Sequence, residues 1–275
     1  MGNLVKETPY SEMNATIEVF DRLGVTREHF ARLRTDVSYA ERISSYMLCG
    51  GIDGSVHQKL ARALMDHQNF FGIEEWSTFH GISFTKKQLR EVAEFPWGED
   101  VLNAPCPWNT GKLIRETHTA FLGLSKFKGE PLTILKWHDI CTATGQPKFD
   151  FNQNPWYKEN VFAKDATCQF RWHLMLREIM PNSTKKKVED QPGMLPAEYE
   201  IPTAISEVTK NLLYYRKNNV WLNPARWART AEITPHDGFS CVGYFDGDGL
   251  DVRDWDGGPG YDVGVGASRA SLHET

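Results

Sequence analysis

The residues of this chain best suited to chemistry gather between positions 244 and 264, where aspartate and glycine dominate. Asp246 and Asp248 stand two apart, and carboxylates at such spacing on a loop can share a calcium ion. An EF-hand loop, however, needs an acid at its fifth position and Glu at its twelfth, and counting from Asp246 gives Leu250 and Gly257 there. The spacing therefore excludes an EF-hand. It leaves two alternatives, a calcium-dependent binding protein or hydrolase that uses the aspartates, and plain turns built from Asp and Gly.

Other catalytic or metal-binding patterns are missing from the sequence. There is no GxSxG elbow, no cysteine beside a histidine and no HExxH spacing. His118, His138 and His173 are interpreted as hydrogen-bonded core or edge residues. The five cysteines are odd in number and form no CxxC pair, which argues against a disulfide framework or zinc site and favours a reducing compartment. We therefore expect a cytoplasmic binding protein without a cofactor and not an enzyme.

Composition and net charge narrow the classes of ligand that the chain is expected to bind. The 275 residues are 40% hydrophobic, enough for one or two cores, and carry a net charge of -5 with a pI near 6.0. This balance gives no electrostatic case for nucleic acid or an anionic membrane. No apolar run reaches the length of a membrane span, and the first residues lack the apolar core of a signal peptide. A protein or another macromolecule is the expected ligand.

Helical periodicity dominates residues 10–66. Thr26, Ser55, Thr85 and Thr203 stand where N-caps belong, although His29 in place of Glu or Gln leaves the Thr26 capping box incomplete. Two helices around a turn at 23–26 also fit a helix-turn-helix, so a DNA-associated regulatory protein is an alternative function. The apolar residues that carry the periodicity are Ile17, Phe20, Leu23, Phe30, Leu33 and Val37.

Short strands are expected to dominate after the first hundred residues. The pattern predicts a helix over 162–180, a solvated mobile loop over 182–198 and another helix from Thr203. We place the domain boundary near residue 100, with a helical region over 1–100 and a second domain over 101–275. The segments with strand-like composition are 117–124, 132–140, 220–222, 227–231, 240–245 and 263–268.

The C-terminal segment resembles a known family. Leu250-Asp251-Val252-Arg253-Asp254-Trp255-Asp256, followed by Tyr261-Asp262-Val263-Gly264-Val265-Gly266-Ala267-Ser268-Arg269, is similar to the end of the variable proteins of diversity-generating retroelements. Upstream, Tyr199-Glu200-Ile201-Pro202-Thr203-Ala204 with Glu207 resembles, more weakly, the helix entry of C-type-lectin-like domains of the formylglycine-generating-enzyme type. The resemblance covers about residues 199–270.

The resemblance implies a mechanism that restricts composition. In that family, mutagenesis directed at adenines changes Asn codons to a limited set of residues that excludes Lys, Glu, Gln, Met and Trp. From Ile233 to His273 the chain has no Lys, Glu, Gln or Met, and Trp255 is the only tryptophan. Against the family's template, Asp251, Arg253, Asp254 and Asp262 fall on diversified positions, whereas Val252 and Trp255 fall on fixed ones. The family's proteins are not enzymes and display variable side chains to bind ligands.

We therefore expect an α+β protein, in which a helical N-terminal region precedes a C-type-lectin-like domain with short twisted strands and two helices. Its exposed C-terminal loops would display a diversified surface over residues 233–268. Phe245, Leu250, Trp255 and Val263 would form the scaffold beneath it. Tyr and Arg would supply most of the binding energy, because both bury area while still forming hydrogen bonds. The expected ligand-binding residues are Tyr244, Asp246, Asp248, Asp251, Arg253, Asp254, Asp256, Tyr261 and Asp262.

Overall fold

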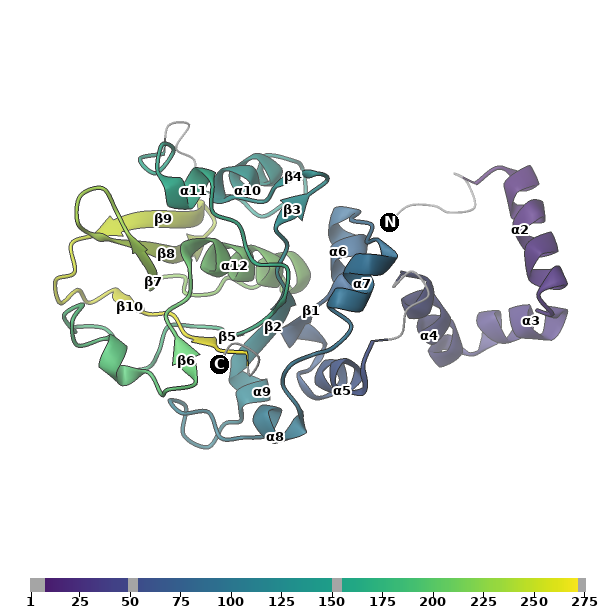
Figure 1. The fold of residues 1–275 in the computed structure, drawn as a ribbon, viewed down its shortest axis with the longest axis horizontal. Helices are drawn as coiled ribbons and strands as arrows, with labels where there is room; N and C mark the ends of the chain where they lie inside the picture. Colours follow the sequence, from purple (N-terminus) through teal and green to yellow (C-terminus); the bar gives the residue numbers. More distant parts are fainter. Residues whose placement is uncertain (1–7, 49–53, 150–154, 272–275) are drawn as a thin grey trace. The chain divides into compact units, whose positions relative to one another are not determined.

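A computed structural model describes residues 8–48, 54–149 and 155–271 of the chain (Figure 1). The fold is mixed α and β, as the sequence indicates. The chain divides into two compact units, residues 1–51 and residues 52–275. Residues 52–100, which the sequence analysis assigned to the helical N-terminal region, thus belong to the larger unit. Within the described residues, no helix is both long and apolar enough to cross a membrane.

The first unit consists of α2 (Tyr10–Arg22), α3 (Arg27–Thr35) and α4 (Val37–Leu48). Thr26 is the N-cap residue of helix α3, and the Nδ1 atom of His29 accepts a hydrogen bond from the Thr26 backbone N–H at 3.0 Å. The expectation of an incomplete capping box was therefore wrong, because an imidazole nitrogen accepts where a Glu or Gln oxygen usually does. No residue of α2 or α3 is buried, so these helices lack a core of their own.

The second unit contains a five-stranded sheet with the strand order β1-β2-β5-β11-β6. Ser55 caps helix α5 (Val56–Leu64), as the sequence predicts, because its hydroxyl accepts a hydrogen bond from the Gln58 N–H. Thr85 likewise accepts from the Gln88 N–H where α7 begins. The strands are β1 (Phe70–Phe71), β2 (His118–Leu122), β5 (Trp172–Leu176), β6 (Tyr199–Glu200) and β11 (Ser268–Arg269), and the short helices among them are α6 (Ile73–His80), α7 (Lys86–Glu91), α8 (Glu99–Leu102), α9 (Ile114–Thr117) and α11 (Val161–Lys164).

Two segments adopt the opposite structure to the one predicted. The expected helix over 162–180 is only α11 followed by strand β5, whose five residues are all buried between β2 and β11. A strand buried on both faces is continuously apolar, so its period of two is invisible in the sequence. The expected strand over 132–140 is instead largely helix α10 (Ile134–Cys141), which follows the small hairpin of β3 (Lys126–Phe127) and β4 (Glu130–Pro131). Thr133 caps this helix, because its hydroxyl accepts from the Lys136 N–H at 3.1 Å.

The C-terminal part of the unit is a four-stranded sheet with the order β10-β7-β8-β9 (Figure 1). It comprises β7 (Trp227–Ile233), β8 (Phe239–Asp246), β9 (Gly249–Trp255) and β10 (Val263–Val265), whereas residues 220–222 form no strand. Helix α12 (Ala204–Asn218) is capped by Thr203, as predicted, and packs against β7, β8 and β9. Residues 249–255, expected to lie in exposed loops, form strand β9 at the edge of this sheet.

The segment 182–198 is exposed over much of its length, including Lys185, Lys186 and Lys187, as the sequence predicts, but it is also anchored at several points. Ser183 and Gln191 are fully buried. The Ser183 hydroxyl accepts from the Val265 N–H at 2.9 Å, and the Val188 N–H donates to the Gly257 carbonyl at 3.1 Å. The segment therefore lies along the C-terminal sheet with its lysine run exposed to solvent.

Candidate binding surface

The four-stranded sheet has two faces of different character. Residues opposite one another in paired strands point to the same face. Val242 lies opposite Val252, and both are buried on the face that packs on α12. Trp227 lies opposite Gly243, and Cys241 opposite Arg253, on the other face. We call this second side the outer face.

A cluster of four side chains occupies one end of the outer face, and we call it the aromatic–arginine cluster: Trp227, Tyr244, Arg253 and Asp262. The rings of Trp227 and Tyr244 stack with centroids 4.4 Å apart and an interplanar angle of 18°. The Arg253 guanidinium lies 4.8 Å from the centroid of the Trp227 ring, and its Nη1 is 3.6 Å from Asp262 Oδ2. The cluster thus combines an aromatic platform with a cation and a carboxylate.

A break in the regular pairing of β8 and β9 positions Tyr244. Register shifts between Gly243 and Asp246, and Tyr244 has the left-handed φ of +46°. Regular alternation would send the Tyr244 side chain toward α12, but the irregularity brings it onto Trp227. Gly243 makes this possible, because a Cβ there would lie 2.2 Å from the Arg226 carbonyl oxygen.

The cluster contains an unsatisfied polar group. Trp227 is 7% exposed, and its Nε1 is buried without a hydrogen-bond partner. Buried N–H groups usually have a partner, so this donor is an exception to the rule. Tyr244 is 43% exposed, and the side chains of Arg253 and Asp262 are about half exposed, so the surface around Trp227 is accessible.

At Arg229, two residues after Trp227 on β7, the segment 182–198 covers the outer face. Arg229 is 7% exposed, its Nη1 donates to the Val188 carbonyl and to Gln191 Oε1 at 3.4 Å each, and its guanidinium lies 4.5 Å from the Phe239 ring centroid. Burial lowers the pKa of Arg229 and raises that of the neighbouring Cys241 thiol. The segment 182–198 therefore closes this part of the face, whereas the aromatic–arginine cluster stays open.

Two of the predicted aspartates, Asp246 and Asp256, shape turns with their side chains. Asp246 Oδ1 accepts from the Asp248 N–H at 2.8 Å in the tight turn between β8 and β9. Asp256 Oδ1 accepts from the Gly258 N–H at 3.0 Å after β9 ends. Such Asx turns are a common use of Asp beside Gly. Asp248 and Asp256 are exposed and Asp246 is half-buried.

The other predicted residues lie in different surroundings. Asp254 accepts from Thr234 Oγ1 at 2.7 Å and so fastens the β7–β8 connection. Tyr261 is 76% exposed, and the Lys185 ammonium lies 4.6 Å from its ring centroid. Asp251 is half-buried on the outer face, opposite Gly243. The structure thus brings Tyr244, Arg253 and Asp262 together and leaves Asp254 with a structural contact.

The residues expected to form the scaffold are buried. Leu250, Phe245, Val263 and Trp255 are between 0% and 6% exposed. His118, also expected in the core, is fully buried, and its Nε2 lies 3.1 Å from the Tyr199 hydroxyl. Burial lowers the pKa of His118 to about 3, so its imidazole is neutral. His173 was expected on a helix but lies on β5, where it stacks on Phe121.

Within the described ranges, no three His, Cys, Asp or Glu side chains gather closely enough to hold a metal ion. The aspartates of the 246–262 segment are distributed over a turn, two sides of β9 and a second turn. The calcium alternative therefore has no three-carboxylate group to support it in this part of the chain.

Trp227 is the central residue that sequence reasoning missed. The composition of residues 227–231 predicts only a short strand there and gives no sign of a binding role for Trp227. Its role depends on contacts with β8 and β9 that only the folded chain provides. A search against protein-family models, curated proteins and solved structures found no match for this chain.

Proposed function

We propose that this chain is a non-enzymatic binding protein, that it uses the aromatic–arginine cluster and the neighbouring exposed residues to bind a protein ligand, and that it is a variable protein of a diversity-generating retroelement. The observation that carries the proposal is the division of strand β9 and its neighbours into buried and accessible residues. Val252 and Trp255, which the resemblance marks as fixed, are buried. Arg253 is exposed and Asp262 half-buried, and the resemblance marks both as diversified.

Side-chain chemistry supports a protein ligand. Tyr244 and Tyr261 are large, semi-rigid side chains that lose little conformational entropy on binding. Arg253 adds a cation that forms hydrogen bonds, and Tyr and Arg are enriched among residues that dominate binding energy. The carboxylates of Asp248, Asp256 and Asp262 favour a ligand with basic groups near the rim.

A rigid frame makes replacement of these side chains compatible with the fold. The β8–β9 turn is closed by the backbone pairing of Asp246 with Gly249, and the buried side chains of Leu250 and Val252 hold β9. Because the exposed side chains contribute little to this core, changing them alters the surface more than the backbone. A C-type-lectin-like arrangement is part of the proposal, supported by two small sheets beside helix α12 and by a C-terminal strand, β11, paired with β5 and β6.

The alternative of a DNA-associated regulator has weaker support. Residues 8–48 contain five arginines, no lysine and six acidic residues. Arg32 is already paired with Asp36 at 3.2 Å. A duplex-binding surface needs a net excess of cations along one face, and these helices do not provide that excess.

One genomic observation and one biochemical experiment test the proposal. The gene should be accompanied by a near-identical repeat of its 3′ end next to a reverse transcriptase gene, with differences confined to template adenines. A genome without that repeat removes the retroelement role.

For the biochemical test, a display library randomised at Tyr244, Asp251, Arg253, Tyr261 and Asp262 is selected against an immobilised basic protein such as hen lysozyme. We expect folded binders with dissociation constants in the micromolar range or below. A matched library randomised at Leu250, Val252, Trp255 and Val263 should give mostly unfolded chains. Equal yields of folded chains from the two libraries would contradict the division into frame and surface.

A further inference from the structure

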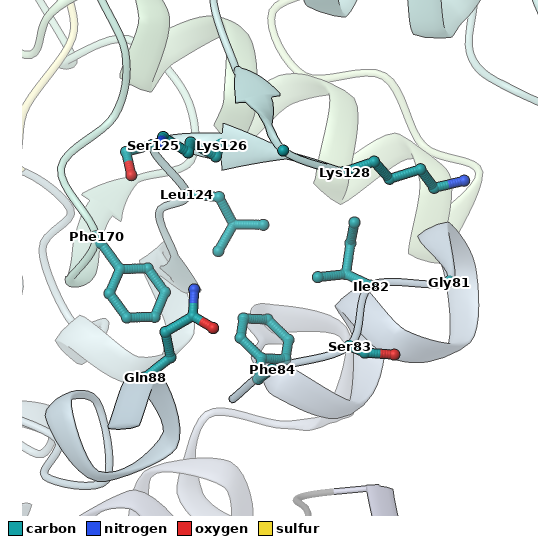
Figure 2. A pocket seen from close by; sticks show the side chains of 11 residues that line it. Gly81, Ile82, Ser83, Phe84, Gln88, Leu124, Ser125, Lys126, Lys128 and Phe170 are labelled. Carbon is teal, nitrogen blue, oxygen red and sulfur yellow. The ribbon is translucent and has the colours of Figure 1, made fainter. Parts of the chain in front are cut away.

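A separate cavity lies in the larger unit, and none of its lining residues belongs to the four-stranded sheet (Figure 2). It has a volume of about 410 Å³ and is bounded by the segment between α6 and α7, the β3–β4 hairpin and Phe170. This volume is within the usual range of small-molecule sites, about 300–1,000 Å³. Nothing in the proposed binding function uses this cavity.

The lining of the cavity mixes apolar and polar side chains. Ile82, Phe84, Leu124 and Phe170 supply its apolar part, with the Gln88 amide between the two phenylalanines in Figure 2. The ring centroids of Phe84 and Phe170 are 6.4 Å apart with an interplanar angle of 25°, so the two rings are nearly parallel. Leu124 is 3% exposed and forms the floor. A flat apolar body would gain dispersion contacts and lose water on entering such a site.

The rim of the cavity carries uncompensated positive charge. Lys126 and Lys128 both line it, both are exposed, and neither forms an ion pair with a carboxylate within the described ranges. The nearest acidic residue in sequence, Glu130, is already paired with Lys136. Lys128 and Gly129 both have positive φ, of +49° and +94°, as a tight two-residue hairpin turn requires. The turn therefore places both lysines at the rim, where the Lys128 side chain extends away from the hollow in Figure 2 and its Nζ lies 5.4 Å from the Phe127 ring centroid.

From the aromatic and aliphatic side chains on one side of this open hollow and the two lysines at its rim, we propose that the cavity binds a small amphipathic anion, a flat apolar molecule bearing one carboxylate, sulfonate or phosphate. The apolar body lies against Phe84, Phe170 and Leu124, and the anionic group lies at the rim beside Lys126 and Lys128. The Gln88 Oε1 already accepts from Thr85, so its amide nitrogen is the group available to donate to the ligand.

The test uses 8-anilinonaphthalene-1-sulfonate as the probe, with fluorescence titration of the full chain. We expect saturable binding that Ser125→Trp weakens at least about tenfold, because an indole at this lining position occupies the hollow. Phe84→Ala should weaken binding in the same direction by removing part of the wall. Circular dichroism melting curves establish that each variant is folded.

The anionic part of the proposal has its own control. The double variant Lys126→Glu with Lys128→Glu should weaken binding of the sulfonate about tenfold, because it replaces two exposed cations at the rim by anions that repel the ligand. The neutral analogue N-phenyl-1-naphthylamine should be insensitive to that variant. Lys158→Glu with Lys164→Glu changes the net charge equally at exposed positions away from the cavity, and should leave binding unchanged.

Three results would overturn the inference. The first is the absence of saturable binding. The second is equal affinity in the Ser125→Trp variant, which would place the probe elsewhere. The third is an equal effect of the two lysine pairs, which would reduce the anion preference to net charge. Tyr244→Ala should leave probe binding unchanged, and this result separates the cavity from the aromatic–arginine cluster.

Discussion

Two charged clusters of the larger unit use ion pairs in opposite ways. Glu75 on α6 is 5% exposed and contacts two cations, with Arg62 Nη1 at 2.8 Å and Lys217 Nζ at 2.9 Å from its Oε1. Its Oε2 accepts from the Gly72 N–H at 2.7 Å. Arg253 and Asp262, in contrast, are about half exposed and 3.6 Å apart. The first cluster joins α5, α6 and α12, whereas the second lies on an open surface.

The difference separates charges that hold the fold together from charges that lie on the proposed binding surface. A buried charge that loses its partner is left without solvent or a counterion, so the Glu75 cluster tolerates little change. A half-exposed pair is screened by water, so either member can be replaced at small cost. A protein that varies its binding surface needs both kinds, a charge network that fixes the frame and charges at the surface that can change.

The sharpest test of the comparison is Glu75→Gln. It removes the buried carboxylate shared by Arg62 and the nearly buried Lys217 and leaves Arg62 with Glu74 alone, and we expect a loss of about 3–5 kcal/mol in the free energy of unfolding. Urea denaturation at pH 7 measures this loss. Glu91→Gln on α7, which changes an exposed carboxylate, is the matched control and should cost less than about 0.5 kcal/mol. A loss below about 1 kcal/mol for Glu75→Gln would mean that Glu74 takes over as partner of Arg62.

The same residue predicts an acid limit to stability. Burial alone would raise the pKa of Glu75, but Arg62 and Lys217 outweigh it and lower the pKa from 4.5 to about 2. Because the folded-state pKa is depressed, the stabilisation is fully present above pH 4.5 and is lost as the pH falls toward 2. The shift corresponds to about 3 kcal/mol.

Comparison of wild type with Glu75→Gln isolates this effect. His80 and His118, whose burial lowers their pKa to about 4 and about 3, titrate in both proteins and cancel in the difference. The difference in unfolding free energy between the two proteins should shrink between pH 4.5 and pH 2. A constant difference across this range would show that Glu75 is not held as a carboxylate by its cations.

The frame was easier to predict from the sequence than the surface. Caps at Ser55 and Thr203 were found because a side chain bonding to a nearby N–H is a local property. Strands β7 and β8 were found from their composition. Strand β5 was not, because its five buried residues show no alternation, and tertiary burial decided its structure.

The candidate surface was half predictable. Arg253 and Asp262 were expected from the resemblance and Tyr244 was among the expected ligand-binding residues, and the fold brings the three together. Trp227 was not expected, because its contacts depend on the register of β7 with β8 and on an irregularity at Gly243. The structural use of Asp254 was also hidden, because its partner Thr234 lies twenty residues earlier on another strand connection.

Gly243→Ala tests whether the backbone irregularity holds the surface together. The added Cβ would lie 2.2 Å from the Arg226 carbonyl oxygen, so the β7–β8 pairing must shift, at an expected cost of about 1–3 kcal/mol. Tyr244 should lose its stack on Trp227, which near-ultraviolet circular dichroism detects. Gly247→Ala, where the Cβ meets nothing within 4 Å, is the matched control and should preserve the spectrum. An unchanged aromatic spectrum in Gly243→Ala would separate the stack from this glycine.

The smallest expected effect is the coupling between Arg253 and Asp262. A double-mutant cycle with Arg253→Ala and Asp262→Asn should give about 0.2–1 kcal/mol, because both side chains are near half exposure. In 1 M NaCl the coupling should fall further, since the screening length is then about 3 Å. A coupling above about 2 kcal/mol, or one insensitive to salt, would make this pair part of the frame. Arg253 and Asp262 could then not vary independently, and the contrast with Glu75 would disappear.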